Sequence, residues 1–206
     1  MVGGGAGQRF GGAKQYELLD DRRVIDHAVD VARSCSDGVV VVVPPDDVAV
    51  EGGVAGGATR ADSVRAGLEA VPGSATIVCV HDAARPLASR ALFESVVDAV
   101  RRGADGAVPG VPVTDTVKVV RGDVVVDTPD RSSLVAVQTP QAFRAAVLRA
   151  AHASGADATD DASMVERLGG RVVVVAGDPD NRKLTHPDDL EWARSVVARA
   201  GSEASA

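Results

Sequence analysis

The stretch TIVCVHDAARP, residues 76–86, governs how the rest of the sequence is interpreted. Residues 76–80 form an uninterrupted apolar run, and such runs are typical of strands that are buried on both faces of a parallel sheet. The polar residues His81, Asp82 and Arg85 follow directly, so we expect them at the carboxyl end of that strand. Open α/β sheets bind ligands at such ends. The stretch therefore predicts a central strand that leads into a binding site.

Similar apolar runs alternate with amphipathic segments along the whole chain. Two further runs, residues 39–43 and 171–176, have the composition of buried strands. The spacing of apolar residues predicts helices over residues 22–34, 62–71, 90–102, 140–151 and 187–199. This alternation predicts an α/β fold with a doubly wound, mostly parallel sheet.

With 45% hydrophobic and 25% charged residues, the chain has the composition of an ordinary globular protein. Its length predicts a single domain over residues 1–206. The sequence contains no apolar run long enough for a membrane span and its start lacks the pattern of a signal peptide, so we expect a cytoplasmic protein without membrane contact. A net charge of -7 argues against nucleic acid as a partner. Cys35 and Cys79 lack metal-ligand spacing, so no protein metal site and no disulfide is expected.

One segment, TVKVVRGDVVVDTP at residues 116–129, interrupts the alternation. Its two valine-rich runs flank Gly122 and Asp123, which is a β-hairpin signal. We expect an inserted hairpin arm within residues 113–133. Because few residues are available to cover its apolar face, a partner subunit is the natural cover, and the arm predicts a homodimer.

The glycine-rich stretch from Gly3 to Gly7 is followed by Arg9 and Lys14. Bare backbone amides and two cations within one loop suit a triphosphate. The stretch matches neither a Walker loop nor the dinucleotide fingerprint, since Phe10 occupies the third glycine position. By itself such a stretch also fits a flexible chain start.

Each of the other polar clusters has a functional and a structural interpretation. Asp82 fits a metal or sugar contact and Arg85 a phosphate contact, or the two form an ion pair within their turn. We interpret His81 as structural. The segment GGATRADS, residues 56–63, offers backbone groups to a planar base or is a capped loop, and TDDAS, residues 159–163, has the pattern of a capped helix start.

Nine segments in order, GGGAGQRF, KQY, GGATRADSV, HDAARP, PVTDTVK, DRSSL, TPQAF, TDDAS and DNRKLTHPDDL, together resemble the 2-C-methyl-D-erythritol 4-phosphate cytidylyltransferases of the non-mevalonate isoprenoid pathway. The resemblance implies the Rossmann-like nucleotidyltransferase fold with a dimerisation arm. It also implies transfer of CMP from CTP to methylerythritol phosphate, with release of pyrophosphate and Mg²⁺ bridging the CTP phosphates. Ribitol or related polyol-phosphate cytidylyltransferases share several of these motifs and are the alternative, as is a non-catalytic nucleotide-binding relative.

The resemblance also assigns roles to individual residues. It implies catalytic roles for Arg9, Lys14 and Lys183. It implies CTP contacts for Gly4, Gly5, Ala6, Gly7, Gly57, Ala58, Ser63, Asp82 and Ala83. It implies acceptor contacts for Arg85, Thr116, Arg131, Thr139 and Thr159, of which Thr116 and Arg131 reach the site from the partner subunit. Lys118, the remaining lysine, is expected to have a structural or dimer-contact role.

The chain start departs from the resemblance. Family members enter the glycine loop from a full apolar strand, whereas here only Met1 and Val2 precede Gly3. We therefore expect a truncated first strand, and either a physiological start upstream of Met1 or a chain with reduced stability and turnover.

Overall fold

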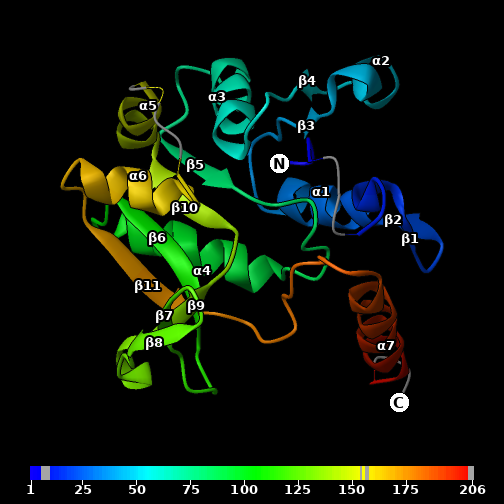
Figure 1. Ribbon diagram of the computed structural model, residues 1–206. Helices are drawn as coiled ribbons and strands as arrows, with labels where there is room; N and C mark the ends of the chain where they lie inside the picture. Colours follow the sequence, from blue (N-terminus) through cyan, green and yellow to red (C-terminus); the bar gives the residue numbers. More distant parts are fainter. Residues whose placement is uncertain (6–9, 154, 156–157, 204–206) are drawn as a thin grey trace.

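The computed structural model describes residues 1–5, 10–153, 155 and 158–203, which form an α/β fold (Figure 1). The helices are α1 Val24–Ser34, α2 Val48–Glu51, α3 Arg60–Ala70, α4 Arg90–Arg101, α5 Ala145–Ala153, α6 Asp161–Arg167 and α7 Pro187–Glu203, with short 3-10 turns η1 Lys14–Tyr16, η2 Pro45–Asp47 and η3 Arg131–Ser133. The strands are β1 Leu18–Leu19, β2 Arg22–Arg23, β3 Val42–Val43, β4 Val54–Ala55, β5 Ile77–Val80, β6 Gly106–Pro112, β7 Val119–Arg121, β8 Val124–Asp127, β9 Val135–Val137, β10 Gln141–Arg144 and β11 Val172–Ala176. Within the described residues, no helix has the length and apolarity needed to cross a membrane.

The central sheet is mixed, which corrects the expected mostly parallel sheet. Its strand order is β11-β6-β10-β5, and β9 pairs with the end of β6. β11 runs parallel to β6, but β10 runs antiparallel to both β6 and β5. The expected helix 140–151 was therefore wrong in its first part, because Gln141–Arg144 is this inserted strand and α5 begins only at Ala145.

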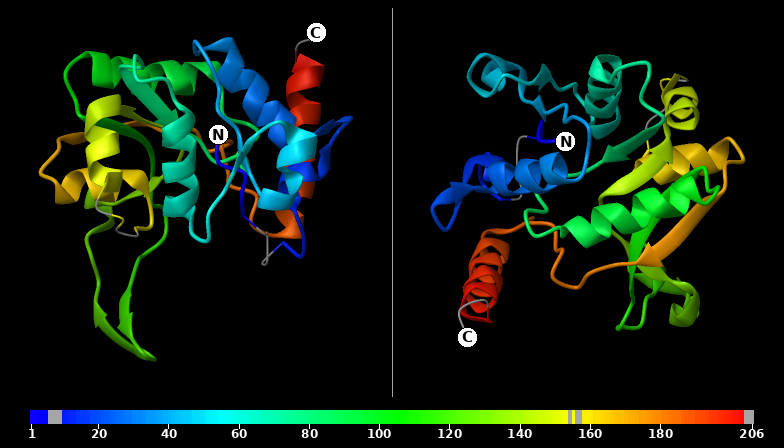
Figure 2. Two further views of the ribbon diagram at one scale, coloured as in Figure 1. Left: turned by 90° about the horizontal axis from the view of Figure 1, so that it is seen from above. Right: turned by 180° about the vertical axis from the view of Figure 1, so that it is seen from behind.

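The two faces of the sheet are covered by different helices. α4 lies along one face, as the view from behind shows, while α5 and α6 cover the other (Figures 1 and 2). The two-residue period of a strand explains how β10 contributes to both cores. Phe143 packs with Leu148 and Val165 on the α5–α6 side, and Ala142 packs with Val96 on the α4 side. The sheet is thus packed between two apolar layers, one on each face.

The chain start joins two parts of the fold. The amide of Val2 donates to the carbonyl of His81 over 2.7 Å, and the amide of Gly3 donates to the carbonyl of Val42 over 2.7 Å. Val2 thereby bridges the parallel pair β3–β4 to the segment that follows β5. These few residues hold Asp82 in register with the start of the glycine-rich stretch.

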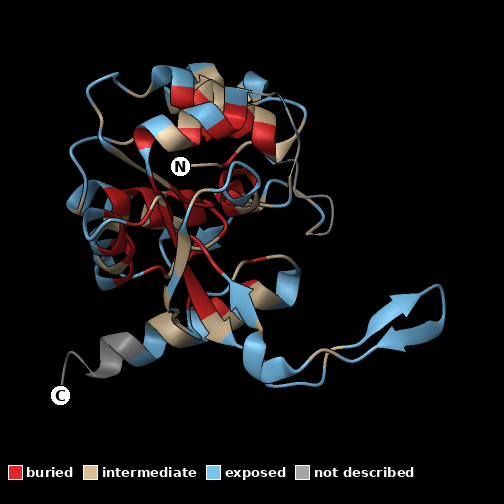
Figure 3. Ribbon diagram, turned by 90° about the vertical axis from the view of Figure 1, so that its left-hand side faces the viewer, coloured by how far each residue is buried: buried red, intermediate tan, exposed pale blue. Residues whose placement is uncertain are grey.

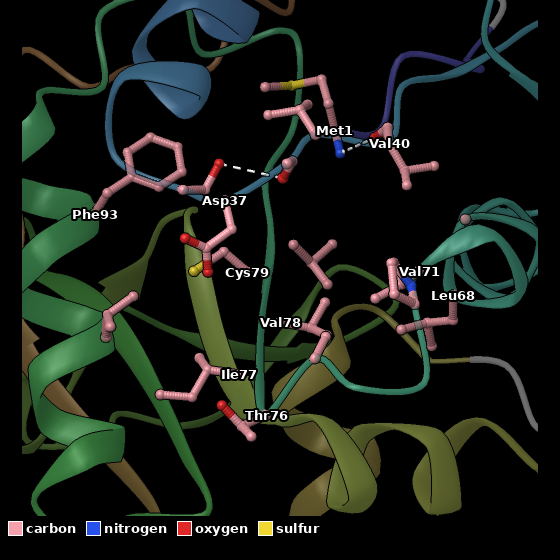
Figure 4. A pocket seen from close by; sticks show the side chains of 18 of the residues that line it. Met1, Asp37, Val40, Leu68, Val71, Thr76, Ile77, Val78, Cys79 and Phe93 are labelled. Carbon is pink, nitrogen blue, oxygen red and sulfur yellow. Dashed lines mark hydrogen bonds between the residues drawn. The ribbon is translucent and has the colours of Figure 1, made fainter.

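A cavity of about 700 Å³ lies between residues 37–42 and β5, next to Met1 (Figure 4). Its wall includes apolar side chains such as Val78 and Leu68. The expected strand 39–43 is confirmed only for Val42–Val43, since the cavity lies beside Val39 and Val40, where a neighbouring strand would pair. On its other side β5 is paired with β10, so the cavity has the position of a further strand.

A valine-rich extension of five residues placed ahead of Met1 is expected to raise the melting temperature. Each buried valine contributes roughly 1.5 to 3 kcal/mol at most, and the strand would also satisfy open backbone groups, so we expect a rise of about 5 °C or more. The matched control is a glycine-serine extension of equal length. Thermal unfolding measures the melting temperatures of both variants. Equal melting temperatures would contradict the interpretation of the cavity as the position of a further strand.

The hairpin expected from Gly122 and Asp123 is confirmed, because β7 and β8 pair antiparallel around these residues. The arm extends away from the body and all of its strand residues are exposed (Figure 3). Val120 is 58% exposed and Val124 is 59% exposed. Its role in dimerisation stays a prediction.

Candidate active site

A pocket of about 370 Å³ opens at the carboxyl end of β5. Segments far apart in the sequence meet in it. It brings together five of the residues expected from the sequence, namely Asp82, Arg85, Thr139, Thr159 and Lys183. It also contains five residues that were not selected, namely Arg60, Val137, Gln138, Gln141 and Asp160. The central prediction, a site directly after strand 76–80, agrees with this location.

His81 has the structural role expected of it. It is 1% exposed, and its Nε2 lies 3.1 Å from the carbonyl of Arg85, so Nε2 carries the proton and donates. Nδ1 then accepts from the hydroxyl of Thr139 over 3.1 Å. The same hydroxyl oxygen accepts the amide of Asp82 over 3.1 Å. His81 and Thr139 together fix the backbone from which the Asp82 side chain enters the pocket.

Asp82 is held between two cations. Its Oδ2 accepts from Lys183 Nζ over 2.6 Å and its Oδ1 accepts from Arg60 Nε over 3.3 Å. Burial alone would raise the pKa of Asp82, but Lys183 and Arg60 outweigh burial and hold that pKa well below its usual range. Asp82 is therefore a permanent anion that orients cations, and it has no proton to give.

Arg85 does not pair with Asp82, so the interpretation of these two residues as an ion pair was wrong. Its Nη1 donates to the carbonyl of Asn181 over 2.7 Å. Burial lowers the pKa of Arg85, although nearby Asp82 opposes the shift. Asn181 itself is fully buried and donates from Nδ2 to the carbonyl of Thr139 over 2.8 Å. These two hydrogen bonds fix the position of Asn181, and Lys183, two residues later, lines the pocket.

Arg60 is the main residue that the sequence reasoning missed. α3 begins at Arg60 because Thr59 and Asp62 form a capping box, in which the side chain of each accepts the backbone amide of the other. The first residue of a capped helix is usually solvated, so Arg60 was not among the residues predicted for the site. The capping box is also the signal that could have located it, since it starts the helix at this turn rather than at Asp62.

Some predicted residues lie beside the pocket rather than in it. The amide of Gly57 donates to Ser63 Oγ over 3.2 Å, and a Cβ built on Gly4 would lie 3.4 Å from the same oxygen. The glycine-rich stretch and the turn at residues 56–63 are thus neighbours. Ala83 is buried and donates its amide to the carbonyl of Val2 over 3.0 Å.

Other predicted residues are not brought to the pocket within this chain. Gly5 and Ala58 are exposed, and Lys14 is half-buried on η1. Thr116 and Arg131 are exposed at the base of the arm, where Arg131 donates to the carbonyl of Thr114. Ala6, Gly7 and Arg9 lie outside the described residues. The roles expected for all of these residues stay predictions.

Acid is expected to weaken the fold through His81. Burial lowers the pKa of His81 to about 4 from its ordinary 6.5. As the pH falls, His81 is therefore protonated in the unfolded chain before it is protonated in the fold. The free energy of unfolding falls as the pH drops from about 6.5 to about 4, by roughly 3 kcal/mol at most. His81→Gln, which keeps a donor but cannot titrate, should lose less stability over that window.

Urea unfolding at several pH values measures the difference between wild type and His81→Gln. His186→Gln, at an exposed histidine, is the matched control and should follow the wild type. A parallel loss of stability in wild type and His81→Gln would show that His81 is protonated in the fold.

Arg60, Arg85 and Lys183 line this pocket at the carboxyl end of β5, which is where open α/β sheets bind their ligands. The sequence model of the 2-C-methyl-D-erythritol 4-phosphate cytidylyltransferases (IspD) matches residues 1–199. The chain belongs to this family.

Similarity to individual members of the family supports this assignment. The 2-C-methyl-D-erythritol 4-phosphate cytidylyltransferase of Nocardia farcinica is 50% identical, over 92% of this chain and 84% of its own length. The bifunctional IspD/IspF enzyme of Anaeromyxobacter dehalogenans is 44% identical over 96% of this chain, which spans 56% of that enzyme. The crystal structure of the Thermus thermophilus cytidylyltransferase superimposes with a TM-score of 0.80 at 35% identity, covering 96% of both chains.

Proposed function

We propose that this protein transfers CMP from CTP to 2-C-methyl-D-erythritol 4-phosphate in isoprenoid precursor biosynthesis. The products are 4-diphosphocytidyl-2-C-methyl-D-erythritol and pyrophosphate. The observation that supports the proposal most is the pocket in which Arg60, Arg85 and Lys183 surround Asp82, in a chain of this family. Because the proposed reaction consumes CTP, we place it in the cytoplasm.

The reaction needs charge compensation more than it needs a protein nucleophile. A phosphate oxygen of the acceptor forms a bond to the α-phosphorus of CTP, and the bond from that phosphorus to the bridging oxygen breaks, so pyrophosphate leaves with the electron pair. Two anions must approach each other, and preorganised cations reduce their repulsion. We assign Lys183, which Asp82 orients, and Arg85 to this task at the acceptor, and we assign Arg9 and Lys14 to the triphosphate.

Mg²⁺ is proposed as the ion that neutralises the triphosphate when it is bound. Asp82 and Asp160 are the carboxylates that line the pocket, and Mg²⁺ prefers oxygen ligands. The oxygens of Asp82 already accept from Arg60 and Lys183, and those of Asp160 accept from Ser163 and Gln141. Among the residues that the structure describes, no cluster of three potential ligands forms a protein cage. The phosphates of CTP and water would therefore supply its ligands.

A homodimer is proposed on the basis of the arm. Val119, Val120 and Val124–Val126 leave an apolar surface exposed on a hairpin that nothing in the described chain covers. A second copy would bury it, and would carry Thr116 and Arg131 of one subunit toward the acceptor site of the other. Lys118, which donates to Thr128 Oγ1 over 2.9 Å, would strengthen the base of the arm.

Turnover with two acceptors tests the proposed function. Purified protein with Mg²⁺ and CTP is expected to release pyrophosphate with methylerythritol 4-phosphate and much more slowly with ribitol 5-phosphate. Faster release with ribitol 5-phosphate would favour a polyol-phosphate cytidylyltransferase. CTP binding without release on either acceptor would favour a non-catalytic relative.

A further inference from the structure

A series of hydrogen-bonded side chains connects the protein core to the pocket. Asp161, the first residue of α6, is fully buried and does not line the pocket. Its Oδ1 lies 2.9 Å from Nε2 of His152, which is also buried. Its Oδ2 accepts from Arg60 Nη1 over 2.8 Å. A buried residue that does not itself line the pocket is thus bonded directly to a residue in its wall.

Arg60 uses a second nitrogen of the same planar group toward the pocket. Its Nε donates to Asp82 Oδ1 over 3.3 Å, while Asp82 Oδ2 accepts from Lys183 over 2.6 Å. Each oxygen of Asp82 therefore has its own cation. The rigid fork of a guanidinium couples the positions of the two carboxylates that it bridges.

The Asp161 carboxylate determines which way Arg60 faces. With the negative charge of Asp161 removed, Asp82 would be the nearest remaining anion for Arg60. A guanidinium free to turn would pair with both oxygens of Asp82, the geometry it prefers. Arg60 would then compete with Lys183 for Oδ2, and the ammonium group would leave its position.

We propose that Asp161, held in place by His152, is a positioning residue of the transferase site. It restrains Arg60 so that one oxygen of Asp82 stays reserved for Lys183. This inference rests on the proposed function for its kinetic part, because Lys183 is assigned there to the reacting phosphates. His152 and Asp161 touch neither substrate, and they act through Arg60 and Asp82.

A double-mutant cycle separates positioning from a purely structural role. Asp161→Asn is expected to lower kcat roughly tenfold with the KM for CTP nearly unchanged, but to lower it less than about twofold when Lys183 is already alanine. His152→Gln, which keeps a donor toward Asp161, should stay close to wild type, whereas His152→Ala should resemble Asp161→Asn. An equal factor in both Lys183 backgrounds would overturn the proposal, since a loss of folded protein does not depend on Lys183.

A second readout needs no turnover. Acetic anhydride labelling of the free protein, followed by mass spectrometry, measures the reactivity of Lys183 relative to Lys118 on the exposed arm. Asp161→Asn is expected to raise this ratio several-fold, and an unchanged ratio would overturn the proposal. If Asp161→Asn does not fold, His152→Ala is judged by the same ratio. Wild-type protein that fails to turn over would contradict the proposed function while the labelling result still decides the positioning role.

Discussion

Lys183→Ala is expected to lower kcat by roughly a hundredfold or more, which is the usual scale for removing one preorganised charge stabiliser. Lys183 Nζ lies 2.6 Å from Asp82 in the pocket, so the substitution removes a cation and leaves a buried carboxylate with one partner fewer. Steady-state kinetics with CTP and methylerythritol phosphate measures the loss. Lys118→Ala, on the exposed arm, is the matched control and should change kcat little. An equal loss in both variants would refute the division into catalytic and structural lysines.

Lys14→Ala and Arg131→Ala are each expected to lower kcat by about a hundredfold, and mixing the two variants should restore activity. If Arg131 completes the partner's site, a mixed dimer contains one site with both residues intact. After full exchange of subunits, roughly a quarter of all sites would be intact. Activity is measured while the subunits exchange, and native mass spectrometry monitors the extent of exchange.

The control for the mixing experiment pairs Lys14→Ala with Lys183→Ala. Both lysines are assigned to the site of their own subunit, so no mixed dimer has an intact site and no activity should return. If the Arg131 mixture also stays inactive despite proven exchange, Arg131 belongs to its own subunit's site.

The sequence predicted the location of the site because chemistry and fold coincide at residues 76–86. An apolar run is recognisable as a buried strand, and the polar residues after it must then lie at the sheet's edge. The hairpin was predictable for a similar reason, since the glycine–aspartate pair at Gly122 and Asp123 is a local turn signal. Both inferences used only neighbouring residues, and the described structure agrees with both.

The errors arose where distant residues decide the outcome. Residues 141–144 have the spacing of a helix start, but they form β10 because β5 and β6 offer open edges on either side. Tertiary pairing overrides local preference there. Arg60 and Asp161 are 101 positions apart in the sequence, and no local pattern predicts that they pair.

The most direct test of the proposed transfer follows an isotope through one turnover. Methylerythritol 4-phosphate labelled with ¹⁸O in its phosphate is incubated with CTP, Mg²⁺ and the protein, and both products are analysed by mass spectrometry. Attack of the acceptor's phosphate oxygen on the α-phosphorus predicts that all label stays in the cytidine diphosphate product and none reaches pyrophosphate. Label in pyrophosphate, or no cytidine diphosphate product at all, would contradict the proposed reaction.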